Sequence, residues 1–165
     1  MRSVFRLIMI WLTAVTLVHA APGDAFFDAS LGDYAAELKA AQQQGKQGVL
    51  LVVESEACPY CKRMREQVLS QTEVQQYFRR HFNSYSVDMN GSVPVTGLDG
   101  REMTEKAFVR TLKVRGTPTF LFFAADGREM ARYNGATRDA ATFLALGRYV
   151  AEGHWRKTTF DQYQK

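Results

Sequence analysis

Cysteine is scarce in this chain: Cys58 and Cys61 are the only two among 165 residues. Any cysteine chemistry must therefore take place at this one pair. Long apolar runs are also missing, because the longest, Leu7–Val18, is shorter than the roughly 20 residues that span a bilayer. No internal repeat or low-complexity block occurs, which argues against a repeat array or a disordered chain.

The chain also lacks a strong excess of charge of one sign. Its formal net charge is +4, and Arg2 and Arg6 contribute two of these positive charges. Without its first 20 residues the chain would carry 19 basic and 17 acidic residues, with the two signs interspersed. A nucleic-acid-binding protein concentrates its basic residues on a patch or stripe. We therefore expect no nucleic-acid partner.

The N-terminus has the pattern of a secretory signal peptide. Two arginines precede the twelve-residue apolar segment Leu7–Val18, and Val18-His19-Ala20 then provides small residues at a cleavage site. Pro22 disfavours a cut after Ala21, so cleavage is expected near Ala20. The alternative is an uncleaved anchor, which the short apolar segment disfavours. We therefore expect a periplasmic or otherwise exported protein.

A hydrophobic content of 46% is sufficient for one core. The remaining chain is too short for two cores. The connection from 89 to 103 is expected to be a long loop, whose length suggests a functional or inserted segment. No secondary structure is predicted for the C-terminal tail. The expected divisions are a signal peptide at 1–20, an irregular lead-in at 21–30, one domain at 31–153 and a polar tail at 154–165.

Helical and strand patterns alternate along the domain. Val49–Val53 is continuously apolar, as expected for a strand that is covered on both faces of an α/β sheet. Asp126-Gly127 is typical of a hairpin turn between two strands. The predicted helices are 33–44, 59–69, 72–78, 104–113 and 139–153, and the predicted strands are 49–53, 83–88, 119–123 and 128–133.

The two cysteines form the motif Cys58-Pro59-Tyr60-Cys61, between the first predicted strand and a predicted helix. The first turn of a helix has unpaired N–H groups and partial positive charge, which stabilise a thiolate there. A purely structural disulfide is disfavoured, because stabilisation grows with loop length and this loop holds only Pro59 and Tyr60. The motif therefore predicts a reactive dithiol.

Together with Lys62 and with Thr117-Pro118-Thr119 ahead of a later strand, this motif resembles the thioredoxin superfamily over residues 30–152. The order Leu-Val-Val-Glu-Ser-Glu-Ala-Cys-Pro-Tyr-Cys-Lys is most similar to the exported SoxW-type thioredoxin-related proteins. The resemblance implies a three-layer α/β fold with a central mixed β-sheet flanked by helices.

The resemblance also implies roles for individual residues. Cys58 would be the attacking cysteine and Cys61 the resolving one. Pro118 would follow a cis peptide bond, and the backbone of Thr117 would bind an extended substrate segment. The alternative without a functional role is a trans proline at the start of a strand. The implied substrate-binding residues are Pro59, Tyr60, Thr117 and Pro118.

One departure from the thioredoxin pattern concerns proton transfer. The buried acid of ordinary thioredoxins would fall at Val52, so their usual proton acceptor is missing. Glu54 is the expected replacement, and Glu56 is a weaker candidate. Two solvated loop glutamates are the alternative interpretation.

These patterns predict an exported, monomeric thiol–disulfide oxidoreductase that reduces protein disulfides and is itself reduced by a membrane electron donor. The SoxW resemblance suggests a substrate in sulfur oxidation. A disulfide oxidase or isomerase with the same site is the first alternative, and a non-catalytic binding module with an inert disulfide is the second. No cofactor is expected, and no metal, because His81 and His154 are too widely spaced for a compact zinc site.

Overall fold

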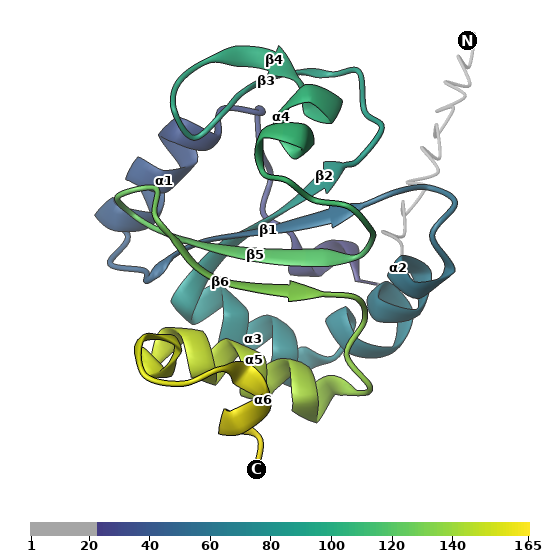
Figure 1. Ribbon diagram of the computed structural model, residues 1–165, viewed down its shortest axis with the longest axis vertical. Helices are drawn as coiled ribbons and strands as arrows, with labels where there is room; N and C mark the ends of the chain where they lie inside the picture. The colour runs from purple at the N-terminus through teal and green to yellow at the C-terminus, as the bar shows by residue number, and fades with distance from the viewer. Residues whose placement is uncertain (1–22) are drawn as a thin grey trace, which may run out of the picture.

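The computed structural model describes residues 23–165, so the expected signal peptide and cleavage site lie outside the described residues. Figure 1 shows a central sheet with helices on both faces. Strand β1 pairs in parallel with β2 and antiparallel with β5, and β5 pairs antiparallel with β6. The sheet is therefore mixed, as predicted. Its order is β2 (Phe82–Asp88), β1 (Gly48–Glu54), β5 (Thr119–Ala124) and β6 (Glu129–Asn134).

The helices form the two outer layers. On one face, α1 (Tyr34–Gln43) and α4 (Glu105–Thr111) contribute to one apolar cluster. On the other face, α2 (Pro59–Met64), α3 (Thr72–His81) and α5 (Ala140–Ala151) contribute to a second. The expected helix 59–69 is in fact α2 followed by a π-helical turn, η2 (Arg65–Leu69). A short 3-10 helix, η1 (Asp24–Phe26), lies near the start of the described chain.

Strand β1 lies at the centre of this arrangement. All of its residues are buried, and Val49 through Val53 are 0% exposed. Successive side chains of a strand point to opposite faces. Leu50 and Val52 accordingly join the cluster beneath α3 and α5, while Leu51 joins the cluster beneath α1 and α4. The rigid, doubly covered strand ends at Glu54, four residues before Cys58.

The expected loop at 89–103 contains a small hairpin instead. Strands β3 (Pro94–Thr96) and β4 (Glu102–Thr104) pair antiparallel, and Thr96 also bridges to Asp33. Val95 is 5% exposed and packs into the cluster beneath α1 and α4. Strands of three residues carry too little alternation to be recognised in the sequence. The prediction of a loop was therefore wrong for the residues of β3 and β4.

The C-terminal segment packs against the domain. A 3-10 turn, η3 (His154–Arg156), and a short helix, α6 (Phe160–Tyr163), follow α5. Trp155, Phe160 and Tyr163 pack against the cluster beneath α3 and α5, and the Tyr149 hydroxyl donates to the Thr158 carbonyl at 2.7 Å. Residues 154–163 thus belong to the folded unit. Within 23–165, no helix has both the length and the apolar character needed to cross a membrane.

Candidate functional site

The two cysteines form a disulfide at the start of α2, with their Cα atoms 5.3 Å apart. Cys58 is the N-cap residue, and its sulfur accepts a hydrogen bond from the Cys61 backbone N–H at 3.1 Å. Pro59 occupies the first helical turn, where an N–H group is not needed. The Cys61 backbone N–H would also stabilise a thiolate at Cys58 in the reduced form.

The sulfur atoms are recessed, whereas the residues between them are exposed. Cys58 is 8% and Cys61 4% exposed, but Tyr60 is 62% exposed. Between the two cysteines, Pro59 and Tyr60 therefore form the exposed surface of this turn. Their role in substrate contact stays a prediction.

The loop before β5 lies beside the dithiol turn. The Thr117–Pro118 peptide bond is cis, which confirms that prediction. The hydroxyls of Thr117 and Ser55 lie 3.4 Å apart, and the Ser55 carbonyl accepts from the Cys58 N–H at 3.1 Å. Ser55 therefore links the cis-proline loop to the cysteine turn.

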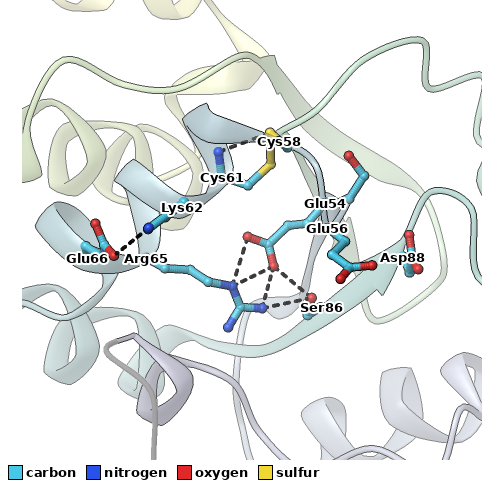
Figure 2. A pocket seen from close by; sticks show the side chains of 10 residues that line it. Glu54, Glu56, Cys58, Cys61, Lys62, Arg65, Glu66, Ser86 and Asp88 are labelled. Carbon is cyan, nitrogen blue, oxygen red and sulfur yellow. Dashed lines mark hydrogen bonds and ion pairs between the residues drawn. A yellow bond between two sulfur atoms is a disulfide. The ribbon is translucent and has the colours of Figure 1, made fainter.

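Glu54 is a buried carboxylate next to the dithiol. It is 6% exposed, so the solvated-loop interpretation is wrong for this residue. Arg65 donates to it through Nε, at 3.1 and 3.2 Å, and through a terminal nitrogen at 2.5 Å. The Ser86 hydroxyl donates to the same carboxylate at 2.9 Å. Figure 2 shows the Glu54 side chain directed toward the Arg65 guanidinium.

Arg65 connects this carboxylate to the start of the described chain. Its second terminal nitrogen donates to Asp24 at 2.6 Å, and its guanidinium lies 4.5 Å from the centre of the Phe27 ring. Sequence reasoning missed Arg65, because its partners come from three separate elements and no local motif joins them. The neighbouring Arg63 points elsewhere and donates to the carbonyl of Thr137 at 2.9 Å.

The position expected for a buried acid is apolar, as predicted. Val52 is 0% exposed within the cluster beneath α3 and α5. Glu54 lies two residues later, on the same face of β1 and nearer to Cys58. Glu56 is exposed. The chain therefore places a carboxylate near the dithiol, but at the rim of the core and bound to an arginine.

A cavity of about 450 Å³ joins these groups (Figure 2). Four of the residues around it are acidic and two are basic. Lys62 and Glu66 form an exposed ion pair at 3.9 Å on its helical side. Among residues 23–165, no three His, Cys, Asp or Glu side chains gather as a metal site would require. The lining residues are Glu54, Ser55, Glu56, Cys58, Cys61, Lys62, Arg65, Glu66, Ser86 and Asp88.

Comparisons with known proteins identify the family of the domain. A family profile described as thioredoxin-like domain matches residues 34–151. A Thermus thermophilus thioredoxin is 32% identical, with 74% of this chain and 88% of that chain covered and a TM-score of 0.56.

Two further solved structures share the fold. A Helicobacter pylori thioredoxin-fold protein has a TM-score of 0.66, at 21% identity and 86% coverage of each chain. A putative disulphide-isomerase from Bacteroides thetaiotaomicron has a TM-score of 0.57, at 26% identity, covering 73% of this chain and 88% of that one. No curated protein sequence matches the chain significantly.

Proposed function

This chain belongs to the thioredoxin-like domain family, and we propose that it is an exported thiol–disulfide oxidoreductase that reduces disulfides in proteins. One observation carries the proposal: a Cys58–Cys61 disulfide at the start of a helix, beside a cis Thr117–Pro118 loop. The fold and the cysteine pair support thiol–disulfide exchange in general. The proposal goes further in naming the direction of electron transfer, the protein substrate and the exported location.

In the proposed reaction, the reduced pair supplies both electrons. The Cys58 thiolate attacks a substrate disulfide, forms a mixed disulfide, and releases one substrate sulfur as a thiolate that takes up a proton. Cys61 then loses its proton and attacks the Cys58 sulfur. This step releases the second substrate thiol and leaves the Cys58–Cys61 disulfide. The substrate is reduced, and the protein is oxidised by the same two electrons.

Proton exchange with Cys61 is assigned in this proposal to Glu54. Glu54 and Cys61 line the same cavity, and the nearest core position, Val52, has no ionisable group. Its contacts with Arg65 and Ser86 orient the carboxylate. The exposed Glu56 is another carboxylate of this cavity and serves as a control residue.

Export and re-reduction complete the proposal. An exported reductase needs an electron source, and we propose a membrane carrier that reduces the disulfide through its own dithiol. The support for export is the residue pattern of 1–20, and the support for a sulfur-oxidation substrate is the sequence resemblance. Fractionation of cells that produce the full chain tests export, with N-terminal sequencing to locate the cut. Retention in the cytoplasm would contradict it.

Insulin reduction tests the activity itself. With a chemical reductant supplying electrons, the protein is expected to accelerate precipitation of the insulin B chain, and Cys58→Ser is expected to abolish this effect. Cys61→Ser should instead trap the mixed disulfide, visible as a covalent adduct. If the parent protein and Cys58→Ser behaved alike, the protein would be a binding module rather than an enzyme.

The alternative activity is that of a disulfide oxidase or isomerase. The solved structure described as a putative disulphide-isomerase supports it. Equilibration of the dithiol with glutathione buffers measures its reduction potential, where about 30 mV corresponds to a tenfold change in the equilibrium constant. A potential near that of a strong oxidant would replace the reductase proposal with an oxidase. Reactivation of a protein with scrambled disulfides would indicate an isomerase.

A further inference from the structure

Charge is distributed unevenly along the edge of the sheet that carries the dithiol. Glu54 at the end of β1 is paired in register with Asp88 at the end of β2. In the other direction, β1 is followed by the start of β5, where Thr119 is in register with Asn134 at the end of β6. The edge therefore runs from two carboxylates, past the cysteine turn, to the cis-proline loop and the end of β6.

A second cavity, of about 560 Å³, lies on the β5–β6 side of this edge. Thr117 lines this cavity and Ser55 lines the dithiol cavity, and the hydroxyls of these two residues lie 3.4 Å apart. Three of its residues are basic and none is acidic, in contrast to the dithiol cavity. It is lined by Lys113, Arg115, Gly116, Thr117, Thr119, Arg132, Asn134 and Gly135.

Two of the three cations in this cavity are not neutralised by the fold. Lys113 and Arg115 are exposed, and neither forms an ion pair or side-chain hydrogen bond with another residue of the described chain. Arg132 differs, because it is held by Glu129 at 2.7 Å and by the Leu112 carbonyl at 2.8 Å. Arg132 thus fixes the turn after α4, and the other two cations face the solvent beside the cis-proline loop.

The backbone at Lys113 supports a role for its side chain. Its φ is +56°, the only positive value outside glycine among the described residues. Glycine or asparagine adopts this conformation more readily than lysine. Lysine therefore occupies a position where its backbone conformation is unfavourable, and among the described residues its side chain forms no ion pair or hydrogen bond that would offset this.

We propose that this basic cavity binds acidic side chains of the substrate polypeptide, close to the disulfide that Cys58 attacks. The inference deepens the proposed function and rests on it. An extended substrate segment that binds along Thr117 would pass between the two cavities. Acidic residues on one side of the substrate cysteine would then favour the orientation that places them in the basic cavity. The preferred substrate class is a protein whose reactive cysteine has aspartate or glutamate on one flank and no such charges on the other.

Matched peptide disulfides test this inference. Three peptides of equal length would carry Asp-Asp before the cysteine, Asp-Asp after it, or Asn-Asn at both places, each as a disulfide-linked homodimer. One of the acidic peptides is expected to give a kcat/KM roughly three- to tenfold above the neutral peptide at low salt. Salt should reduce the preference, because the contacts are exposed.

Variants of the two free cations locate the effect. Arg115→Ala and Lys113→Asn should each lower the preference for the acidic peptide while leaving the rate with the neutral peptide unchanged. Lys157→Ala, at an exposed position after η3 that does not line this cavity, removes the same charge and should change neither rate. An equal loss in all three variants would attribute the effect to net charge and overturn the inference.

The two proposals fail in different ways. Hydroxyethyl disulfide is neutral and small, so its reduction depends on the dithiol and not on the basic cavity. If the protein reduced neither this compound nor any peptide, the proposed function would be wrong. If it reduced all three peptides at the same rate, the oxidoreductase would stand and the substrate preference would be rejected.

Discussion

The two sides of the dithiol differ in how their charges are balanced. On the β1–β2 side, Glu54 is buried and bound by Arg65 and Ser86, and Arg65 also binds Asp24. On the β5–β6 side, Lys113 and Arg115 are exposed and make no side-chain contact of this kind within 23–165. The first set of charges supports the structure of the site, while the second is accessible to a partner.

The physical reason for this difference is the cost of desolvation. A carboxylate that is only 6% exposed loses most of its hydration, so it needs hydrogen bonds and an opposite charge within the protein. Exposed cations keep their water and need no partner. Substitutions on the first side should therefore affect stability, and substitutions on the second side should mainly affect substrate choice.

The largest effect is expected for Arg65→Met, which leaves the Glu54 carboxylate buried without its cation. Breaking a fully buried pair costs about 3–5 kcal/mol. Because the Arg65 side chain is 28% exposed, we expect the free energy of unfolding to fall by about 2–3 kcal/mol in urea denaturation. Lys62→Met breaks the exposed Glu66 pair and should change it by less than about 0.5 kcal/mol.

Removing the charge of Glu54 as well should recover part of the stability that Arg65→Met loses. In the double variant Glu54→Gln with Arg65→Met, no buried charge remains unpaired, so the two substitutions should cost less together than the sum of their separate effects. Additive losses would show that Arg65 stabilises the fold through Asp24 and Phe27 rather than through Glu54.

A smaller effect is expected for Glu54→Gln alone. The amide keeps the size of the side chain but weakens its bonds to Arg65 and Ser86, so stability should fall by about 1 kcal/mol. If Glu54 exchanges a proton with Cys61, the pH profile of Cys61-dependent turnover should also change. Glu56→Gln is the matched control and should leave the profile as it is. An unchanged profile in Glu54→Gln would remove this residue from proton transfer.

On the other side of the dithiol, Lys113→Asn should stabilise the protein by up to about 1 kcal/mol, because asparagine tolerates the left-handed backbone better. Lys113→Ala removes the same charge without this relief and should not stabilise. Thermal denaturation of both variants separates the backbone effect from the charge effect. A loss of stability in Lys113→Asn would mean that the lysine makes a stabilising contact.

The smallest effect is expected at Asp139, a charge balanced within one turn of helix α5. The Thr142 backbone N–H, the Thr142 hydroxyl and Arg138 lower the pKa of Asp139 from 3.8 to about 2. Because the pKa is lower in the folded state, the ionised group stabilises the protein above pH 4, and this contribution is lost as the pH falls toward 2. Asp139→Asn keeps a good N-cap and should flatten the stability profile in this range only. If Asp139→Asn and the parent protein lost stability in the same way between pH 4 and pH 2, the lowered pKa would not belong to Asp139.

Local patterns in the sequence identified the parts of the site that are close together in the chain. The Cys58–Cys61 pair follows an apolar strand, and the Thr-Pro pair precedes one, so spacing and resemblance were sufficient to predict both. The central sheet was predictable for the same reason, because Val49–Val53 and the strand 119–123 are long enough to be recognised.

Features that depend on distant residues were not predictable in this way. Arg65 and Asp24 are 41 positions apart, and only the packing of η1 against η2 brings them together. The β3–β4 hairpin depends on Val95 reaching the core, and the packing of α6 depends on Phe160 and Tyr163 covering α5. In each case tertiary contacts, rather than local propensity, determine the structure.

The packing of the C-terminal segment has a practical consequence for where the folded unit ends. The family match stops at residue 151, yet the rings of Tyr149 and Phe160 lie 5.5 Å apart, and Tyr133 on β6 also contacts Phe160. A protein cut at the family boundary would expose these aromatic rings to water and become prone to aggregation. Isolated preparations of the domain should therefore extend at least to Tyr163.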